Sequence, residues 1–225
     1  RSEIMKTIMI AEIGINHNGD MKIVKELIDI AANADCDIVK FQKRTIDKVY
    51  TTAYLAEPRE SPWGTTQREQ KEGLELSTED YREIDRYCKE KQIDWMASSW
   101  DVDAQKFLQQ FNLKYNKVAS AMLGNVELLT EIAQEQRFTY ISTGMSTYEE
   151  VDAVVDLFKK YDINILQGYG MTECSPVISI NLLWENKVGS VGKLMPNCEA
   201  KTVDEELWIK GSSVMQGYYK MPQET

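Results

Sequence analysis

The chain has 225 residues, 43% of them hydrophobic, which is enough for one barrel-sized domain or two smaller ones with a buried core. Its formal net charge is -10 and its isoelectric point is near 4.8, so it repels phosphate backbones and anionic lipid. Non-specific binding to nucleic acid or to a membrane surface is therefore not expected, and an anionic substrate would need a locally positive pocket.

Neither a run of about 18 apolar residues nor a charged-apolar-small N-terminal pattern occurs, which argues against a membrane span and a signal peptide. The cysteines lack a CxxC pair and fit reduced, mostly buried thiols better than a disulfide framework or a zinc site. They are Cys36, Cys88, Cys174 and Cys198. Together these features favour a cytoplasmic protein.

Short apolar, β-branched runs alternate with amphipathic stretches from residue 7 to about residue 161. This order predicts an α/β fold of about five βα units, in which crossover helices join parallel strands. The predicted strands are residues 7–14, 37–42, 94–99, 115–120 and 139–144.

Three stretches between these strands carry apolar residues at i, i+3, i+4 and i+7, which predicts helices with one apolar face. The sets are Val24/Leu27/Ile28/Ala31, Ala104/Phe107/Leu108/Phe111 and Val151/Val154/Val155/Phe158. Ser146 with Glu149 is typical of a capping box, and Ser77 before Thr78 is a candidate N-cap.

One connection is much longer than the others, with about 35 residues between the second strand and the helix near Thr78. It contains Pro58, Pro62, Trp63 and Gly64. Connections of this length are usually lids, binding loops or disordered segments. On a parallel barrel this one would lie on the catalytic face.

Candidate functional side chains follow from strand alternation, because chemistry in parallel barrels collects at the carboxyl ends of the strands. Glu12 shares a face with Ile8 and Ile10, and Lys40 and Gln42 share the corresponding face of the next strand. The later strands add Ser98, Lys117, Ser120, Ser142 and Thr143. We therefore expect a carboxylate, two ammonium groups, an amide and several hydroxyls at one end of the sheet.

Lys40 lies within the apolar run IVKFQ, where a buried charge is costly unless it has a partner. Glu12 or a bound anion would supply that partner. Two interpretations stay open, a catalytic pair and a purely structural ion pair. His17, the only histidine, lies in the INHNG turn and is more typical of a packing residue than of a metal ligand.

The segments AEIGINHNGD, KFQK, ASSWD, NKVASA and ISTGMS occur in this order between residues 4 and 162. Their order and spacing resemble the N-acetylneuraminate (sialic acid) synthase family, with its pseudaminic and legionaminic acid relatives. The resemblance implies a (β/α)8 barrel, of which residues 1–164 are the truncated front half. It also implies the condensation of phosphoenolpyruvate with an N-acetylated amino sugar such as N-acetylmannosamine.

The same resemblance implies roles for the candidate side chains. Glu12 would be the acid or base at the water or sugar carbonyl, and Gln42 would orient the sugar. The phosphate and carboxylate of phosphoenolpyruvate would be held by Lys40, Ser98, Lys117, Ser120 and Ser142. Ammonium groups and hydroxyls fixed on strands supply preorganised stabilisation for such an anion.

In the family a divalent metal, Mn²⁺ or Mg²⁺, polarises the sugar aldehyde and is held by two histidines from later strands. This sequence has one histidine, so we expect the metal not to bind and catalysis to be very weak. Strands of an incomplete barrel also leave two open edges, which favour aggregation or association with a second copy.

The sequence changes character past residue 165, since helical periodicity ends and six of the twelve glycines fall between Gly168 and Gly217. EAKTVD and ELWIKG are predicted strands in this strand-rich segment, residues 165–225, and we place the boundary near Asn164.

Three motifs of this segment, GYGMTE, VGSVGKLMPNCEAKTVD and ELWIKGSSVMQGYY, resemble the adenylate-forming superfamily of acyl-CoA synthetases and ligases. The resemblance implies that Thr172 and Glu173 contact ATP phosphates and Mg²⁺, and that Tyr169 and Gly170 line the adenine and acyl pocket. The family's phosphate loop, ribose-binding Asp and catalytic Lys are not found, so we do not expect this segment alone to bind ATP.

The sequence is thus interpreted as a chimera joined between Asp162 and Leu166. Three functions remain open: a synthase that forms a C–C bond, an ATP-dependent ligase fragment and a non-catalytic scaffold.

Overall fold

The computed structural model of the chain describes residues 8–225, so the predicted strand start at Thr7 lies outside the described residues. The chain divides into two compact units, Arg1–Ile163 and Asn164–Thr225. Among residues 8–225, no helix combines the length and the apolar character needed to cross a bilayer.

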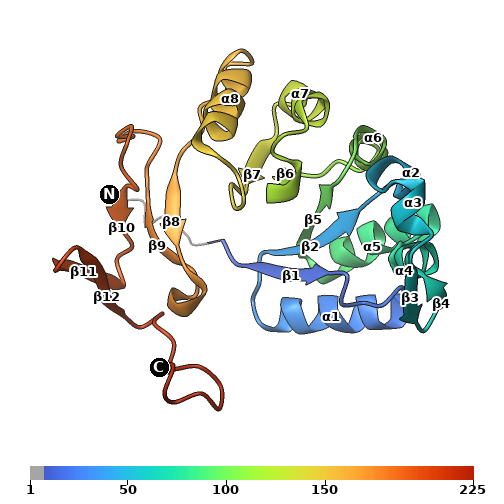
Figure 1. The fold of residues 1–225 in the computed structure, drawn as a ribbon, viewed down its shortest axis with the longest axis horizontal. Coiled ribbons are helices and arrows are strands. Elements are labelled where there is room, and N and C mark those ends of the chain that lie inside the picture. The colour runs from blue at the N-terminus through green and yellow to red at the C-terminus, as the bar shows by residue number, and fades with distance from the viewer. Residues whose placement is uncertain (1–7) are drawn as a thin grey trace. The chain divides into compact units, whose positions relative to one another are not determined.

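The first unit is built on a five-stranded parallel sheet in the order β1-β2-β5-β6-β7 (Figure 1). The strands are β1 (Ile10–Gly14), β2 (Ile38–Lys43), β5 (Asp94–Ser99), β6 (Tyr115–Val118) and β7 (Phe138–Ile141). The predicted α/β class and the number of strands are confirmed. The fourth and fifth strands end earlier than predicted, and Ser120 opens the short 3-10 helix η1 (Ser120–Met122).

Helices follow each strand and form an arc outside the sheet (Figure 1). They are α1 (Met21–Asn33), α5 (Thr78–Lys91), α6 (Val102–Gln109), α7 (Val126–Gln134) and α8 (Tyr148–Lys159). A side-chain oxygen caps the start of each helix, as Ser77 does for α5. The capping box predicted at Ser146 is wrong by one residue, because Thr147 and Glu150 form it.

The hydrophobic core lies between the sheet and these helices. Val39, Phe41 and Trp95 point from the strands toward Tyr81 and Ile84 of α5 and are buried with them. Each such side chain contributes about 1.5–3 kcal/mol of transfer free energy on burial. The predicted apolar faces are confirmed for most positions, but Val155 of α8 is 38% exposed.

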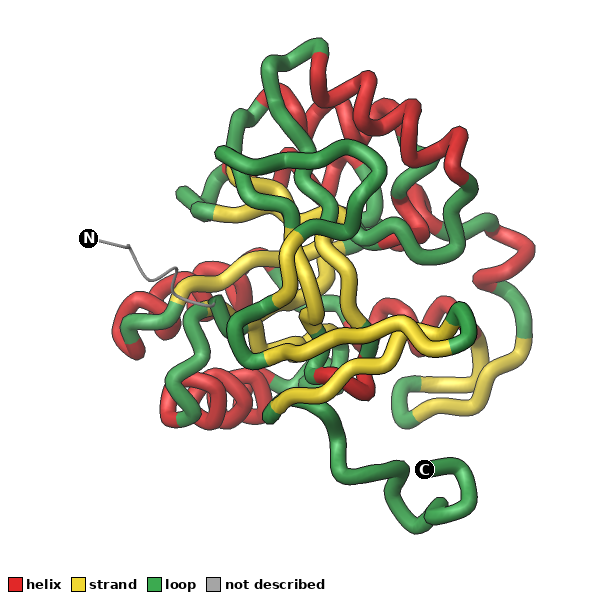
Figure 2. The backbone as a smooth tube through the Cα atoms, turned by 90° about the vertical axis from the view of Figure 1, so that its left-hand side faces the viewer, coloured by secondary structure: helices red, strands yellow, loops and turns green. Residues whose placement is uncertain are grey.

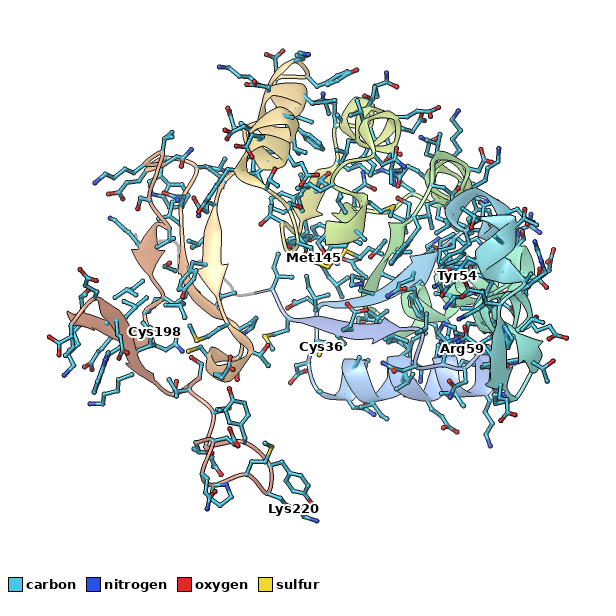
Figure 3. The ribbon with its side chains drawn as sticks, viewed as in Figure 1. Cys36, Tyr54, Arg59, Met145, Cys198 and Lys220 are labelled. Carbon is cyan, nitrogen blue, oxygen red and sulfur yellow. The ribbon has the colours of Figure 1, made fainter. Side chains whose placement is uncertain are left out.

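The long connection after β2 is ordered and carries its own secondary structure, so of the expected alternatives a disordered segment is wrong. It contains α2 (Ile46–Val49), α3 (Thr52–Leu55), the antiparallel hairpin β3 (Pro58–Ser61) and β4 (Gly64–Thr66), and α4 (Gln67–Leu74). Thr66 and Glu69 form a capping box at α4. The arrows of β1 and β2 point toward this insertion (Figure 1), to which the labelled Tyr54 and Arg59 belong (Figure 3).

The second unit contains a three-stranded antiparallel sheet, ordered β10-β9-β8, and a separate hairpin. The sheet strands are β8 (Gly168–Gly170), β9 (Val177–Ile180) and β10 (Lys193–Leu194). The hairpin strands β11 (Cys198–Val203) and β12 (Glu206–Gly211) confirm the strands predicted for EAKTVD and ELWIKG. Beyond β12 the chain runs as loops and turns to the C-terminal label in Figure 2.

Candidate active site

Strand register brings the predicted site residues of the first unit together on one face of the sheet. Glu12 of β1 pairs with Lys40 of β2, and Gln42 of β2 pairs with Ser98 of β5. Ser98 pairs in turn with Lys117 of β6. Because side chains in register on adjacent strands point to the same face, these residues form a continuous row across the sheet.

Lys40 is the buried centre of this row. Its Nζ atom lies 2.7 Å from Glu12 Oε2 and donates a hydrogen bond of 3.2 Å to Ser98 Oγ. The Lys40 side chain is 9% exposed, whereas that of Glu12 is 55% exposed. The ammonium is therefore held in a fixed place, while the carboxylate stays open to water and to a ligand.

Lys117 provides a second ammonium group and donates hydrogen bonds to Ser142 Oγ and to the Val118 carbonyl. The pKa of Lys117 is lowered to about 8, mainly by burial and also by the charge of Lys40, while the charge of Glu12 opposes the shift. Two lysines thus share one carboxylate. A bound anion would relieve this excess of positive charge, so the row is suited to binding a multiply charged anion.

Gln42 and Gly14 lie beside the Glu12 carboxylate. A Cβ atom built on Gly14 would meet Glu12 Oε1 at 3.0 Å and Gln42 Nε2 at 3.7 Å, and Gly14 has a φ of +56°. Glycine is therefore favoured at this position for two reasons. The backbone is left-handed, and the absence of a Cβ atom leaves space for the Glu12 carboxylate. Sequence reasoning overlooked Gly14, although a glycine as the last residue of a strand was a signal for it.

Ser120 and Thr143 lie past the ends of β6 and β7. A Cβ atom on Gly144 would lie 3.8 Å from Ser120 Oγ, so Ser120 faces the turn after β7 that holds Ser142. Thr143 is exposed. The structure therefore gathers Glu12, Lys40, Gln42, Ser98, Lys117, Ser120 and Ser142 along the ends of adjacent strands.

The described residues do not offer a metal centre of the kind that the family resemblance implies. No group of three or more His, Cys, Asp and Glu side chains among residues 8–225 could hold a metal ion. The carboxylate of Glu12 is paired with an ammonium rather than with further oxygen or nitrogen ligands. The donor set thus does not fit a divalent cation.

His17 is buried in the turn after β1, where its Nδ1 atom accepts a hydrogen bond of 3.0 Å from the backbone of Gly19. Burial lowers the pKa of His17 below its ordinary value, and Arg44 adds to this effect. The ring lies 6.3 Å from that of Phe41. These contacts are those of a neutral packing residue.

The residues singled out in the second unit lie close together in the chain. Tyr169 and Gly170 belong to β8, and Thr172 and Glu173 belong to the 3-10 helix η2 (Thr172–Cys174). Glu173 accepts a hydrogen bond from the Tyr218 hydroxyl, and this bond lowers the pKa of Glu173. Its carboxylate thus has a partner within the protein.

Curated proteins match two thirds to three quarters of this chain. A human N-acetylneuraminate-9-phosphate synthase is 35% identical over 158 residues, which cover 69% of this chain and 44% of the relative. An N,N'-diacetyllegionaminic acid synthase from Legionella pneumophila is 35% identical over 172 residues, which cover 75% of this chain and 48% of the relative. The chain thus spans less than half the length of these curated relatives.

A solved N-acetylneuraminic acid synthetase from Leptospira borgpetersenii superposes with a TM-score of 0.60 at 24% identity, covering 69% of this chain and 50% of that one. This likeness shows a shared fold. A long-chain-fatty-acid–CoA ligase from Haemophilus influenzae is 41% identical over 76 residues, but these cover 28% of this chain and 13% of the ligase. That match is a partial indication of the resemblance to adenylate-forming acyl-CoA synthetases and ligases. The profile of the NeuB family matches residues 27–174, and the chain therefore belongs to the NeuB family.

Proposed function

We propose that the first unit is the phosphoenolpyruvate-binding part of a sialic-acid-synthase-type (β/α)8 barrel, which acts in the condensation of phosphoenolpyruvate with an N-acetylated amino sugar. The observation that carries this proposal is the row of Lys40 and Lys117 beside Glu12. Both lysines bond to serine hydroxyls on neighbouring strand ends. Family membership supports the same chemistry.

Phosphoenolpyruvate carries a phosphate and a carboxylate, and the row offers two separate cations for them. Lys40 with Ser98 would hold one anionic group, and Lys117 with Ser142 and Ser120 the other. Because these donors stand on strands of one sheet, they are already oriented before the ligand arrives, which is the source of electrostatic preorganisation.

The open carboxylate of Glu12 would serve as the acid or base toward the sugar carbonyl or an attacking water. General acid–base catalysis requires hydrogen-bonding reach and solvent or substrate access, and the 55% exposure of this side chain provides access. Gln42, whose amide lies beside the same carboxylate, would orient the sugar. The alternative, a purely structural Glu12–Lys40 pair, predicts no effect of phosphoenolpyruvate on either residue.

Turnover by this chain is proposed to be very low, because the described residues do not form a divalent-metal site. A Lewis acid at the sugar aldehyde is worth several kcal/mol of transition-state stabilisation, so its loss would leave anion binding but little condensation.

The test has two arms. Isothermal titration with phosphoenolpyruvate measures binding, and consumption of phosphoenolpyruvate with N-acetylmannosamine and Mn²⁺ measures condensation. We expect saturable binding that Glu12→Ala leaves in place and Lys40→Met weakens. A chain that does not bind phosphoenolpyruvate, or whose Lys40 variant binds it equally well, contradicts the proposal.

For the second unit we propose a β-rich piece of the adenylate-forming fold. The partial match to the Haemophilus influenzae ligase and the confirmed hairpin β11–β12 support this assignment. Thr172 and Glu173 would stand where that superfamily contacts ATP phosphates and Mg²⁺, but Glu173 is bonded to Tyr218. We expect no ATP–pyrophosphate exchange, and measurable exchange would contradict this.

A further inference from the structure

We propose that Glu135, buried on the side of the sheet opposite the candidate site, is a positioning residue that holds Ser98 and Lys117 at their working separation. This inference rests on the proposed function, because it concerns how the anion-binding row is kept in place. Glu135 itself lies on the far side of the strands and touches no candidate site residue.

The strand pair that carries the site has little backbone pairing of its own. In the described register, β5 and β6 meet at the Ser98–Lys117 pair alone. By comparison, β2 pairs with β5 along its whole length, from Ile38 opposite Asp94 to Lys43 opposite Ser99. The distance between Ser98 and Lys117 must therefore depend on contacts other than the ladder.

Those contacts come from the residues next in sequence, whose side chains point to the opposite face. Ser99 Oγ donates a hydrogen bond of 2.6 Å to Gln105 Oε1 of α6. Gln105 Nε2 donates in turn to Asn116 Oδ1 of β6 at 3.3 Å. Ser99, Gln105 and Asn116 are all at most 4% exposed, so these bonds are shielded from water.

Glu135, the C-cap residue of α7, closes this network. Its Oε1 atom accepts from Gln105 Nε2 at 2.7 Å and from Gln109 Nε2 at 2.9 Å. Its Oε2 atom accepts from Asn116 Nδ2 at 3.0 Å and lies 3.3 Å from Arg137 Nε. The side chain is 9% exposed. One carboxylate thus joins α6, α7 and β6, and reaches β5 through Gln105.

The charge of Glu135 matters because both of its oxygens accept from two donors. In Glu135→Gln, one oxygen becomes an NH2 group that faces two donors whichever way the amide turns, so two hydrogen bonds are lost without a change in volume. Ser99→Ala is a milder variant, since it removes only the bond that links β5 to Gln105.

Asp85→Asn is the matched control. Asp85 also joins a helix to β5, because its Oδ1 atom accepts a hydrogen bond of 3.1 Å from Trp95 Nε1, and its side chain is 21% exposed. Trp95 lies at the other end of β5 from Ser98. This variant therefore neutralises a carboxylate that contacts the same strand, while its amide oxygen can still accept from Trp95, and it leaves the β5–β6 pair untouched.

The first readout needs no substrate. The ε-amine of Lys117, which faces Lys40, Glu12 and Ser142, is titrated by pH-dependent acylation and mass spectrometry in the full chain. If Glu135 positions Lys117, then Glu135→Gln and Ser99→Ala raise its pKa from about 8 toward the ordinary value, because the ammonium becomes more hydrated. Asp85→Asn leaves it unchanged. If the pKa of Lys117 is the same in all variants, the inference is overturned, even where the variants differ in melting temperature.

The second readout is the affinity for phosphoenolpyruvate, which should fall about tenfold in Glu135→Gln and remain unchanged in Asp85→Asn. A purely stabilising Glu135 would lower the melting temperature and leave this affinity intact, which also overturns the inference. If the unmodified chain does not bind phosphoenolpyruvate, the proposed function fails, and the Lys117 titration still decides the role of Glu135.

Discussion

The ammonium of Lys40 and the carboxylate of Glu12 lie 2.7 Å apart on neighbouring parallel strands, but only the ammonium is buried. A buried charge is costly unless it is paired and hydrogen-bonded, and Lys40 depends on both Glu12 and Ser98 for this. The Glu12 carboxylate is about half exposed, so water can stabilise its charge and it does not depend on Lys40 in the same way. The pair therefore combines a fixed cation with a carboxylate that is free to meet a ligand.

Replacing Glu12 by Gln should destabilise the fold, because it leaves the buried Lys40 without its counter-charge. We expect the free energy of unfolding to fall by about 1–3 kcal/mol. Urea denaturation followed by tryptophan fluorescence measures the change. The control is Glu26→Gln, which removes an exposed partner of Lys22 at 4.0 Å and should have almost no effect. Equal unfolding midpoints for the two variants would show that Lys40 does not need Glu12.

Replacing Lys40 by Met should weaken phosphoenolpyruvate binding while the fold is retained, since the two side chains are both long and unbranched. A hydrogen bond to a charged group contributes about 1.5–3 kcal/mol, so the loss should be about tenfold to a hundredfold. Titration calorimetry measures it. Lys114→Met, which removes an exposed lysine paired with Asp94, should bind as the unmodified chain does. Similar losses in both variants would mean that only net charge matters.

Phosphoenolpyruvate affinity should decrease as the pH rises through about 8, because burial lowers the pKa of Lys117 to that value. The sign follows from the lysine: the protonated form attracts the anion, and the neutral form above this pH does not. Below pH 7 Lys117 is almost fully protonated, so its contribution to the affinity should be complete and should no longer change with pH. Binding is measured from pH 6 to 9.5.

Lys117→Arg is the matched variant for this pH dependence, because a guanidinium keeps its charge throughout the range. Its affinity should be nearly constant where that of the unmodified chain declines. A parallel decline in both proteins would assign the pH dependence to another group.

Thr147→Ala should lower the free energy of unfolding by about 1 kcal/mol, because the Thr147 side chain accepts a hydrogen bond from the backbone of Glu150 at the start of α8. Ser146→Ala, one residue earlier, should leave stability unchanged. Thermal and urea unfolding of the two variants distinguish the observed cap from the cap that the sequence predicted. A larger effect at Ser146 would place the helix start where the sequence pattern put it.

Several features could be predicted because they depend on local chemistry. Periodicity located the strands and most apolar helix faces, and alternation placed Glu12 and Lys40 on one face. The misplaced cap shows the limit of such reasoning, since Ser146 and Thr147 are both good caps and only the path of the chain after β7 selects one. The length of the connection after β2 was evident, but its helices and strands were not predicted because they are too short to show a period.

The sequence by itself determined the α/β class, the strands and the polar residues that end them, because apolar residues recur along the chain with the period of the strand or helix that they form. Only the tertiary structure decided the asymmetric burial of Lys40 and Glu12, the low pKa of Lys117 and the position of Glu135 behind the Ser98–Lys117 pair. These properties arise between residues far apart in the chain, since burial and the distances between charges depend on how strands and helices pack.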